Sequence, residues 1–180
     1  IITNTNTATS STTLRFIDDA QNNIVEYCTI KGSQTNTAGG VIFFSTTSVT
    51  SGNDANTIDN NNITCAGANR PVNAIFSAGT SGKENSGNII SNNNFYNFLN
   101  SGTASNGIFL SSNTTTWTIG GNSFYETGSF SPSADVTYNA IQIDNTSGTG
   151  FVITGNSIGG SSPLCGGSAW TKTIGTNNDN

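Results

Sequence analysis

The chain has 180 residues, of which 33% are apolar and only 8% are charged, and its formal net charge at neutral pH is −5. The five basic residues are scattered, which excludes a basic surface that could follow a nucleic acid backbone, and no apolar stretch reaches the roughly 18 to 20 residues that span a bilayer. The sequence contains no His, so the commonest general base and metal ligand is absent.

A short apolar strand recurs along the chain, and its first copy is "TTLRFID" at residues 12–18. Later copies are centred on isoleucines that are each 33 residues apart: Ile42, Ile75, Ile108 and Ile141. The same step leads to Ile174. Equal spacing indicates that these side chains occupy one position of a repeating unit.

A second phrase lies between these strands and reads apolar, x, x, Asn, x, apolar. Its copies carry their central asparagine at four positions: Asn61, Asn93, Asn122 and Asn156. An earlier variant at residues 25–30 has Cys28 in this position. The spacing of this phrase is less regular, so loops between the strands must absorb the difference.

The two phrases together predict the fold. No window shows the i, i+3, i+4, i+7 apolar spacing of an amphipathic helix, whereas β-branched and turn-forming residues are frequent. A unit of about 30 residues with two or three short strands can bury its apolar side only by stacking on copies of itself. The sequence therefore predicts an all-β fold, a right-handed parallel β-helix (solenoid) of about five to six coils. Residues 1–180 are expected to form a single repeat segment, a slice of a longer protein.

The recurrent asparagines predict a structural ladder. Asn accepts the left-handed conformation that a bend between two strands requires, and stacked coils lie about 4.8 Å apart. Amides at equivalent positions are therefore expected to bond to one another in a column: Asn61, Asn93, Asn122 and Asn156. An apolar column is expected beside it: Ile63, Phe95, Phe124 and Ile158.

Three cysteines, Cys28, Cys65 and Cys165, leave at least one thiol without an internal partner. None lies in a Cys-x-x-Cys arrangement, so their spacing predicts no metal site. Two interpretations stay open, small buried apolar residues or one incidental disulfide.

Candidate catalytic acids are few. Asp18 and Asp19 form the only adjacent pair, close to Arg15, where they are placed to hold a cation or to polarise a bond, as acid pairs do in glycoside hydrolysis. The remaining acids fall at different phases of the repeat. We therefore expect no catalysis and interpret Asp18 and Asp19 as a solvated turn. No cofactor is expected, although oxygen-rich loops would allow weak calcium binding.

Aromatic residues offer a candidate ligand platform. Tyr96 follows Phe95 as Tyr125 follows Phe124, so the two tyrosines are expected to point outward from neighbouring coils. Trp117 is a third candidate. Such rings stack on sugars, but cross-strand stabilisation is the commoner role of outward aromatic pairs, and both interpretations stay open.

The phrases "LRFIDDAQNNIVEYCTIKGS" and "GNSFYETGSF…YNAIQIDNTSGTGFVITGNSIGG" resemble the β-helix repeat regions of very large secreted surface proteins of gliding bacteria, the kind exported by the type nine secretion system. The likeness spans nearly all of the chain. It implies a secreted, cell-surface adhesin or filament component, sometimes carried along the surface during gliding. It brings no catalytic residues with it.

The sequence therefore predicts a non-catalytic structural or adhesive segment of a surface protein. The alternative is a polysaccharide-active enzyme, a lyase or hydrolase, or a carbohydrate-binding module. Expected partners are other segments of the same large protein, other cell-surface or secretion proteins, and surface polysaccharide, with no nucleic acid and no membrane insertion. Contacts are expected at residues 64–73 and 126–139, because loops carry function on a rigid scaffold.

Overall fold

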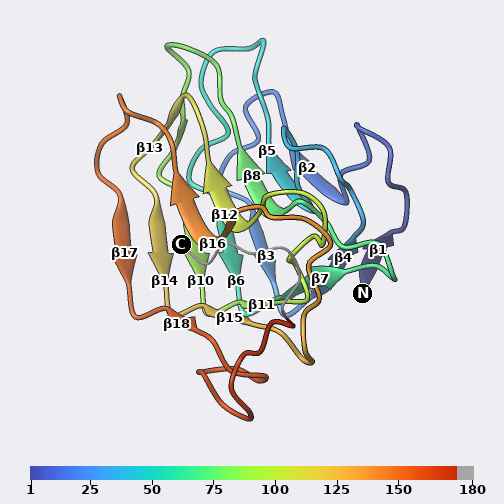
Figure 1. The fold of residues 1–180 in the computed structure, drawn as a ribbon. Coiled ribbons are helices and arrows are strands. Elements are labelled where there is room, and N and C mark those ends of the chain that lie inside the picture. The colour runs from blue at the N-terminus through green and yellow to red at the C-terminus, as the bar shows by residue number, and fades with distance from the viewer. Residues whose placement is uncertain (174–180) are drawn as a thin grey trace.

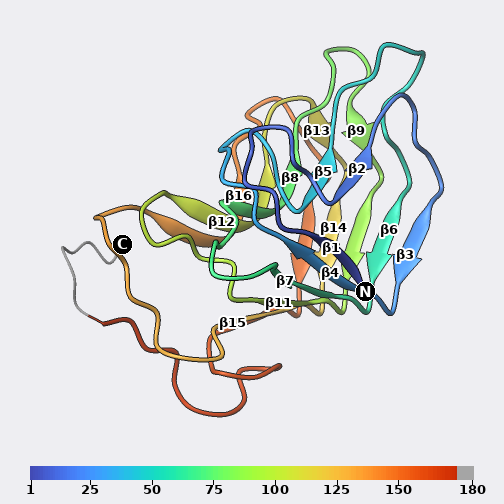
Figure 2. The same ribbon diagram turned by 90° about the vertical axis from the view of Figure 1, so that its right-hand side faces the viewer.

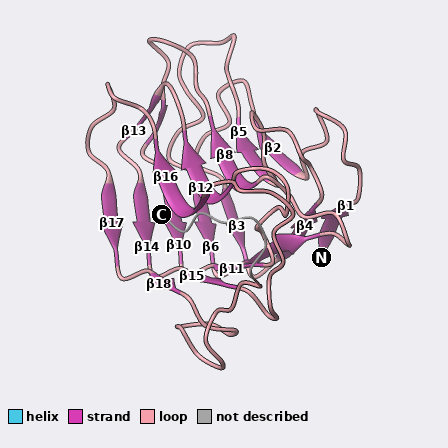
Figure 3. Ribbon diagram, in the orientation of Figure 1, coloured by secondary structure: helices cyan, strands magenta, loops and turns pink. Residues whose placement is uncertain are grey.

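The described residues form a solenoid of parallel β-strands. The structure is a computed structural model, and it describes residues 1–173. Only strands, turns and loops occur among these residues, with no helix (Figure 3). Three sheets run along the stack, and in each turn the chain passes from the first sheet to the second and then to the third (Figure 1, Figure 2).

Strands within each sheet come from successive turns and pair in parallel. The first sheet contains β2 (Leu14–Phe16), β5 (Ile42–Phe44), β8 (Asn73–Ser77), β12 (Ser105–Leu110) and β16 (Tyr138–Ile143). The second contains β3 (Ile24–Glu26), β6 (Thr57–Asp59), β10 (Ile89–Ser91), β14 (Thr118–Gly120) and β17 (Val152–Thr154). The third contains β1 (Ile2–Asn4), β4 (Thr29–Gly32), β7 (Asn62–Cys65), β11 (Asn94–Tyr96), β15 (Ser123–Tyr125) and β18 (Ser157–Ile158). A short pair, β9 (Asn85–Ser86) and β13 (Thr114–Thr115), precedes the second sheet in two turns.

The register of the sheets confirms both repeated phrases. In the first sheet the isoleucines spaced by 33 are successive Cα partners: Ile42, Ile75, Ile108 and Ile141. Ile174 lies outside the described residues. In the second sheet the partners are Val25, Ile58, Ile90, Ile119 and Ile153, and in the third they are Ile30, Ile63, Phe95, Phe124 and Ile158. Loops therefore absorb the unequal spacing, as the sequence predicts.

The solenoid has fewer turns than the sequence predicts. Within residues 1–173, five successive strands of the first sheet make about four turns, not the expected five to six coils. Residues 1–13 contribute only β1. After β18 the chain makes isolated bridges, Ser162 with Gly166 and Phe130 with Lys172, and as far as residue 173 it forms no further strand of the first sheet. These segments add no complete coil, which accounts for the difference.

Each bend from the second to the third sheet contains one residue in the left-handed conformation. These residues have φ from 53° to 67° and are Tyr27, Asn60, Asn92, Gly121 and Gly155. The left-handed residue is thus the one before the ladder asparagine. In the run 60–62 the three asparagines have three roles: Asn60 makes the bend, Asn61 enters the ladder, and Asn62 belongs to β7, where its Oδ1 accepts from Asn94.

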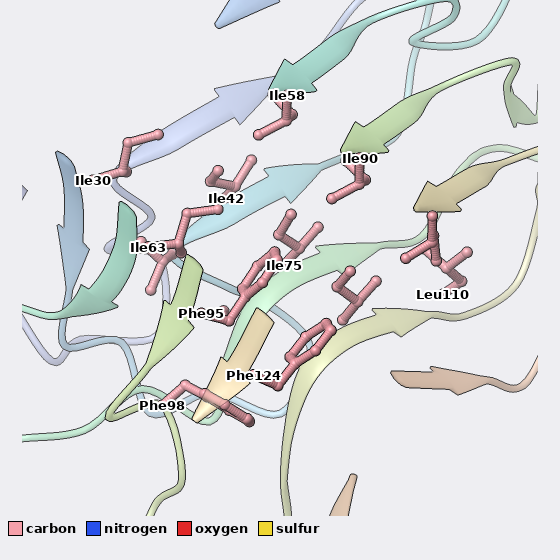
Figure 4. Packing of buried hydrophobic residues seen from close by; sticks show 14 of the residues in the cluster. Ile30, Ile42, Ile58, Ile63, Ile75, Ile90, Phe95, Phe98, Leu110 and Phe124 are labelled. Carbon is pink, nitrogen blue, oxygen red and sulfur yellow. The ribbon is translucent and has the colours of Figure 1, made fainter. Parts of the chain in front are cut away.

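The core lies inside the stack as aligned apolar columns (Figure 4). Ile42, Ile75 and Ile108 are fully buried. Phe95 and Phe124 stack with ring centroids 4.7 Å apart and planes inclined by 8°. Each of these side chains packs against its equivalent in the next coil, so a residue is fully buried only where a coil lies on both sides. Ile141, in the last coil, is accordingly only half-buried.

Candidate functional site

The four predicted ladder asparagines form a hydrogen-bonded column between the second and third sheets. At each step the Oδ1 atom of one asparagine accepts the backbone N–H and the Nδ2 amide of the asparagine one coil earlier, at 2.9 to 3.1 Å. Each Nδ2 also donates to a backbone carbonyl of the earlier coil, as Asn93 does to Ile58 at 2.8 Å. The column starts at Cys28, whose N–H donates to Asn61. These amides hold the coils in register and are not available to a metal or substrate.

Three further asparagine columns were not predicted. One joins Asn23, Asn56 and Asn88 in the bend before the second sheet. Another joins Asn53 and Asn85, both fully buried. A third, on the first sheet, joins Asn73, Asn106 and Asn139. Their spacing of 32 or 33 residues is visible in the sequence, and Asn73, Asn106 and Asn139 each lie two residues before a repeat isoleucine, a signal that was overlooked.

Asp19 fastens the loop of the next coil. Its carboxylate accepts the Thr47 hydroxyl at 2.6 Å, the hydroxyl and N–H of Thr50, and the N–H of Ser51. Asp18 likewise accepts the N–H and hydroxyl of Ser48. The hydrogen bond from Thr47, followed by those from residues 50 and 51, outweighs desolvation and holds the pKa of Asp19 well below its usual range. These carboxylates therefore act as acceptors for a neighbouring loop.

Acid should weaken this loop anchor. Because the folded-state pKa of Asp19 lies below its unfolded value of about 3.8, its stabilisation is present above that pH and is lost as the pH falls below it. We expect Asp19→Asn to have a lower melting temperature than wild type at neutral pH. Between about pH 5 and pH 3 its melting temperature should fall by less than that of wild type. Thermal unfolding followed by circular dichroism at several pH values measures this. If the melting temperatures of the two proteins fell in parallel with pH, the role assigned to Asp19 would be contradicted.

The acids show no clustering that would form a metal centre. Within residues 1–173, no three or more acidic or cysteine side chains gather where a metal ion could be held. The three cysteines are unpaired thiols: Cys28 and Cys65 are half-buried and Cys165 is exposed. The same part of the chain has no helix long and apolar enough to cross a membrane.

The three predicted platform aromatics do not share one surface. Tyr96 and Tyr125 stack with ring centroids 5.3 Å apart, and burial raises the pKa of both phenols. Tyr96 is half-buried, but Tyr125 is only 7% exposed. Tyr96 is thus the more accessible of the pair, and a ligand role for the two stays a prediction.

The prediction that Trp117 forms part of a ligand platform is wrong. Its side chain is fully buried, its indole N–H donates to the Asn85 carbonyl at 2.9 Å, and its ring packs edge-on against Phe44. The reason is local: Thr116 adopts a left-handed conformation and β14 begins only at residue 118, so the alternation of a strand does not apply to Trp117. Phe151, the equivalent residue one coil later, also packs against the core.

An aromatic row on the first sheet was missed. Phe43, Phe76 and Phe109 are successive Cα partners, each one residue after a repeat isoleucine. Their ring centroids lie 5.3 and 5.4 Å apart, and the Arg15 guanidinium lies 5.3 Å from the Phe43 centroid. The rings are inclined to one another by 46° and 65°, so they interlock and form no flat platform. This geometry indicates cross-strand stabilisation.

The two loops predicted to make contacts meet at one ion pair. Arg70, from residues 64–73, pairs with Glu126, and its guanidinium lies 5.2 Å from the Phe130 ring centroid. Glu126 is 1% exposed, and burial raises the pKa of its carboxyl group while Arg70 opposes that shift. Among the described residues no well-aligned hydrogen bond reaches Glu126 Oε1, although the backbone of Phe98 and Leu99 lies close enough to lower the pKa. The pair therefore fixes the start of the 126–139 loop.

Two hollows flank Phe130 at this position. A polar one of about 310 Å³ is lined by both predicted contact loops, including Asn69, Arg70 and Ser129. The other, of about 380 Å³, lies between the 126–139 loop, the start of β16 and the segment before residue 173. Its lining includes three aromatic residues: Phe130, Tyr138 and Trp170. Trp170 was not a predicted site residue, because no repeat position marks it.

Comparison of the chain with models of known protein families, with curated proteins and with solved structures finds no match.

Proposed function

We propose that the chain is a rigid, non-catalytic structural and adhesive segment of a secreted β-helical cell-surface protein, an adhesin or filament. The resemblance to surface proteins of gliding bacteria suggests export by type nine secretion and a role in gliding motility. In this proposal further solenoid coils stack on the segment, and its projecting loops contact other surface proteins or surface polysaccharide.

The observation that carries the proposal is the open face of the last coil. Val152, Ile153 and Ile158 are 50%, 49% and 56% exposed, whereas their partners one coil earlier include Ile119 and Phe124, which are fully buried. In the described part of the chain, the Asn156 backbone N–H donates to no further rung, although its Oδ1 accepts from Asn122. Another coil in the same register would bury these side chains and extend the ladder.

The first test of this proposal is self-association. Unpaired apolar strand edges promote association, so we expect the isolated chain to form concentration-dependent oligomers in sedimentation velocity. Ile153→Lys combined with Ile158→Lys should leave it monomeric. Ile89→Lys is the matched control, because Ile89 is 40% exposed but lies in β10, within the stack. A wild-type chain that stays monomeric, or a control variant that dissociates equally, would contradict coil stacking.

The rival interpretation is a polysaccharide-active enzyme or a carbohydrate-binding module. Incubation with a panel of acidic and neutral polysaccharides, with and without calcium, separates these alternatives. We expect no new reducing ends and no unsaturated products from any substrate. Turnover by the wild-type chain would end the non-catalytic proposal, whereas binding without turnover would favour the module.

A further inference from the structure

The hollow of about 380 Å³ beside Phe130 has the size and lining of a small-ligand site. Trp170 and Tyr138 are half-buried and line it, and Ile158 of the open last coil forms part of its wall. Its polar lining includes Thr137, Asn139, Asp135 and Lys172, so one acidic and one basic residue are balanced. Such a lining does not favour a ligand of strong net charge.

The walls of this hollow are held in place from several directions. The N–H of Phe130 donates to the Thr171 carbonyl at 3.0 Å, and the Phe130 carbonyl accepts the N–H of Thr173 at 2.8 Å. Phe130 packs perpendicular to Tyr138 at 5.2 Å, and Trp170 packs perpendicular to Phe98 at 6.5 Å. Residues far apart in the sequence thus form one preorganised wall, and a ligand would not have to order it.

The polar groups of the lining suit a ligand with several hydroxyl groups. The Asn139 amide nitrogen already donates to Asn106 and Gln142, at 2.9 and 3.2 Å, so its carbonyl oxygen is left as the acceptor for a ligand. The Thr137 hydroxyl can donate or accept, and it is exposed. Aromatic rings provide large apolar faces beside these groups.

We propose that this hollow binds a neutral pyranose residue, exposed on or terminating a surface glycan. Trp170 and Tyr138 contact the apolar side of the sugar, and Thr137 and Asn139 bond to its hydroxyl groups. This inference rests on the proposed adhesive function, for which it names the ligand class. The stacking of coils does not depend on it.

Titration with methyl glycosides tests this site. Saturation-transfer NMR and calorimetry with the methyl pyranosides of glucose, galactose, mannose and N-acetylglucosamine should show saturable binding of at least one. We expect Trp170→Ala to weaken that binding at least tenfold. Tyr27→Ala is the matched control, because Tyr27 is an exposed tyrosine in the first coil and lies outside this hollow; it should leave binding unchanged.

The outcomes separate the two proposals. Binding that is lost in Trp170→Ala and kept in Tyr27→Ala supports the site. Binding of none of the glycosides, or binding that survives Trp170→Ala, overturns it. Unchanged far-ultraviolet circular dichroism shows that Trp170→Ala has kept the fold, and Tyr138→Ala provides a second variant if it has not. Self-association through the last coil remains measurable in all these variants, so failure of the sugar site is distinguishable from failure of the structural proposal.

Discussion

Replacement of Asn93 by alanine should be among the most destabilising single changes in this chain. The side chain accepts the N–H and the Nδ2 of Asn61 and donates to Asn122 and to the Ile58 carbonyl, all inside the stack. Asn93→Ala leaves two buried backbone groups without this partner, the Asn61 N–H and the Ile58 carbonyl, at about 1 to 3 kcal/mol each. We therefore expect a loss of roughly 2 to 6 kcal/mol, a large part of the about 5 to 15 kcal/mol of a typical domain. Urea denaturation measures it.

Two related variants provide the controls for Asn93. Asn156→Ala removes the last rung, which is only half-buried, so water can replace its partners and the loss should be smaller. Asn92→Gly alters the preceding residue, which has φ of 53° and bonds outward to Asp59. Because Gly adopts positive φ without strain, this change should stay within about 1 kcal/mol of wild type. Equal losses for Asn92→Gly and Asn93→Ala would show that the ladder is not the source of stability.

The repeated phrases were sufficient to predict the architecture because a solenoid converts sequence spacing directly into spatial contact. Ile75 lies beside Ile108 because each is the same residue of its coil. The ladder partners followed from the same reasoning, since Asn61, Asn93 and Asn122 are equivalent positions. Prediction was thus reliable for these two columns, whereas the row of Phe43, Phe76 and Phe109, which also occupies one repeat position, was missed.

Prediction failed where the chain leaves the repeat. Trp117 precedes its strand at a bend, and the strand alternation used to place it outward does not extend there. Trp170 and Phe130 contact each other's segments through backbone bonds that join residues about 40 positions apart, outside any repeated phrase. The sequence therefore predicted only that these two loops would make contacts. It did not predict the aromatic lining of the hollow.

Loss of Arg70 should be the second large effect, because Arg70 is the charged partner of a buried carboxylate. Glu126 is 1% exposed, and the Arg70 side chain is 25% exposed. Removal of one member of a buried ion pair costs about 3 to 5 kcal/mol, since the remaining charge stays desolvated. We expect Arg70→Met to show a loss of this size at neutral pH in urea denaturation. Arg70→Met combined with Glu126→Gln should recover most of it, because no charge is then left buried.

The pH dependence of this loss identifies Glu126 as its cause. Burial already raises the pKa of Glu126 above its unfolded value of 4.5, so the folded state holds the proton more tightly, and stability falls as the pH rises through the folded-state pKa. Without Arg70 that pKa rises further, and the folded protein loses stability over a wider range of pH. Arg70→Met should therefore reduce the free energy of unfolding much less at about pH 4.5 than at about pH 7.5.

Comparison with wild type at each pH cancels the contribution of the acids that titrate at lower pH, such as Asp19 and Asp59, whose folded-state pKa values are lowered. An equal loss at both pH values would mean that Arg70 stabilises the loops through packing on Phe130, and that the charge on Glu126 contributes nothing.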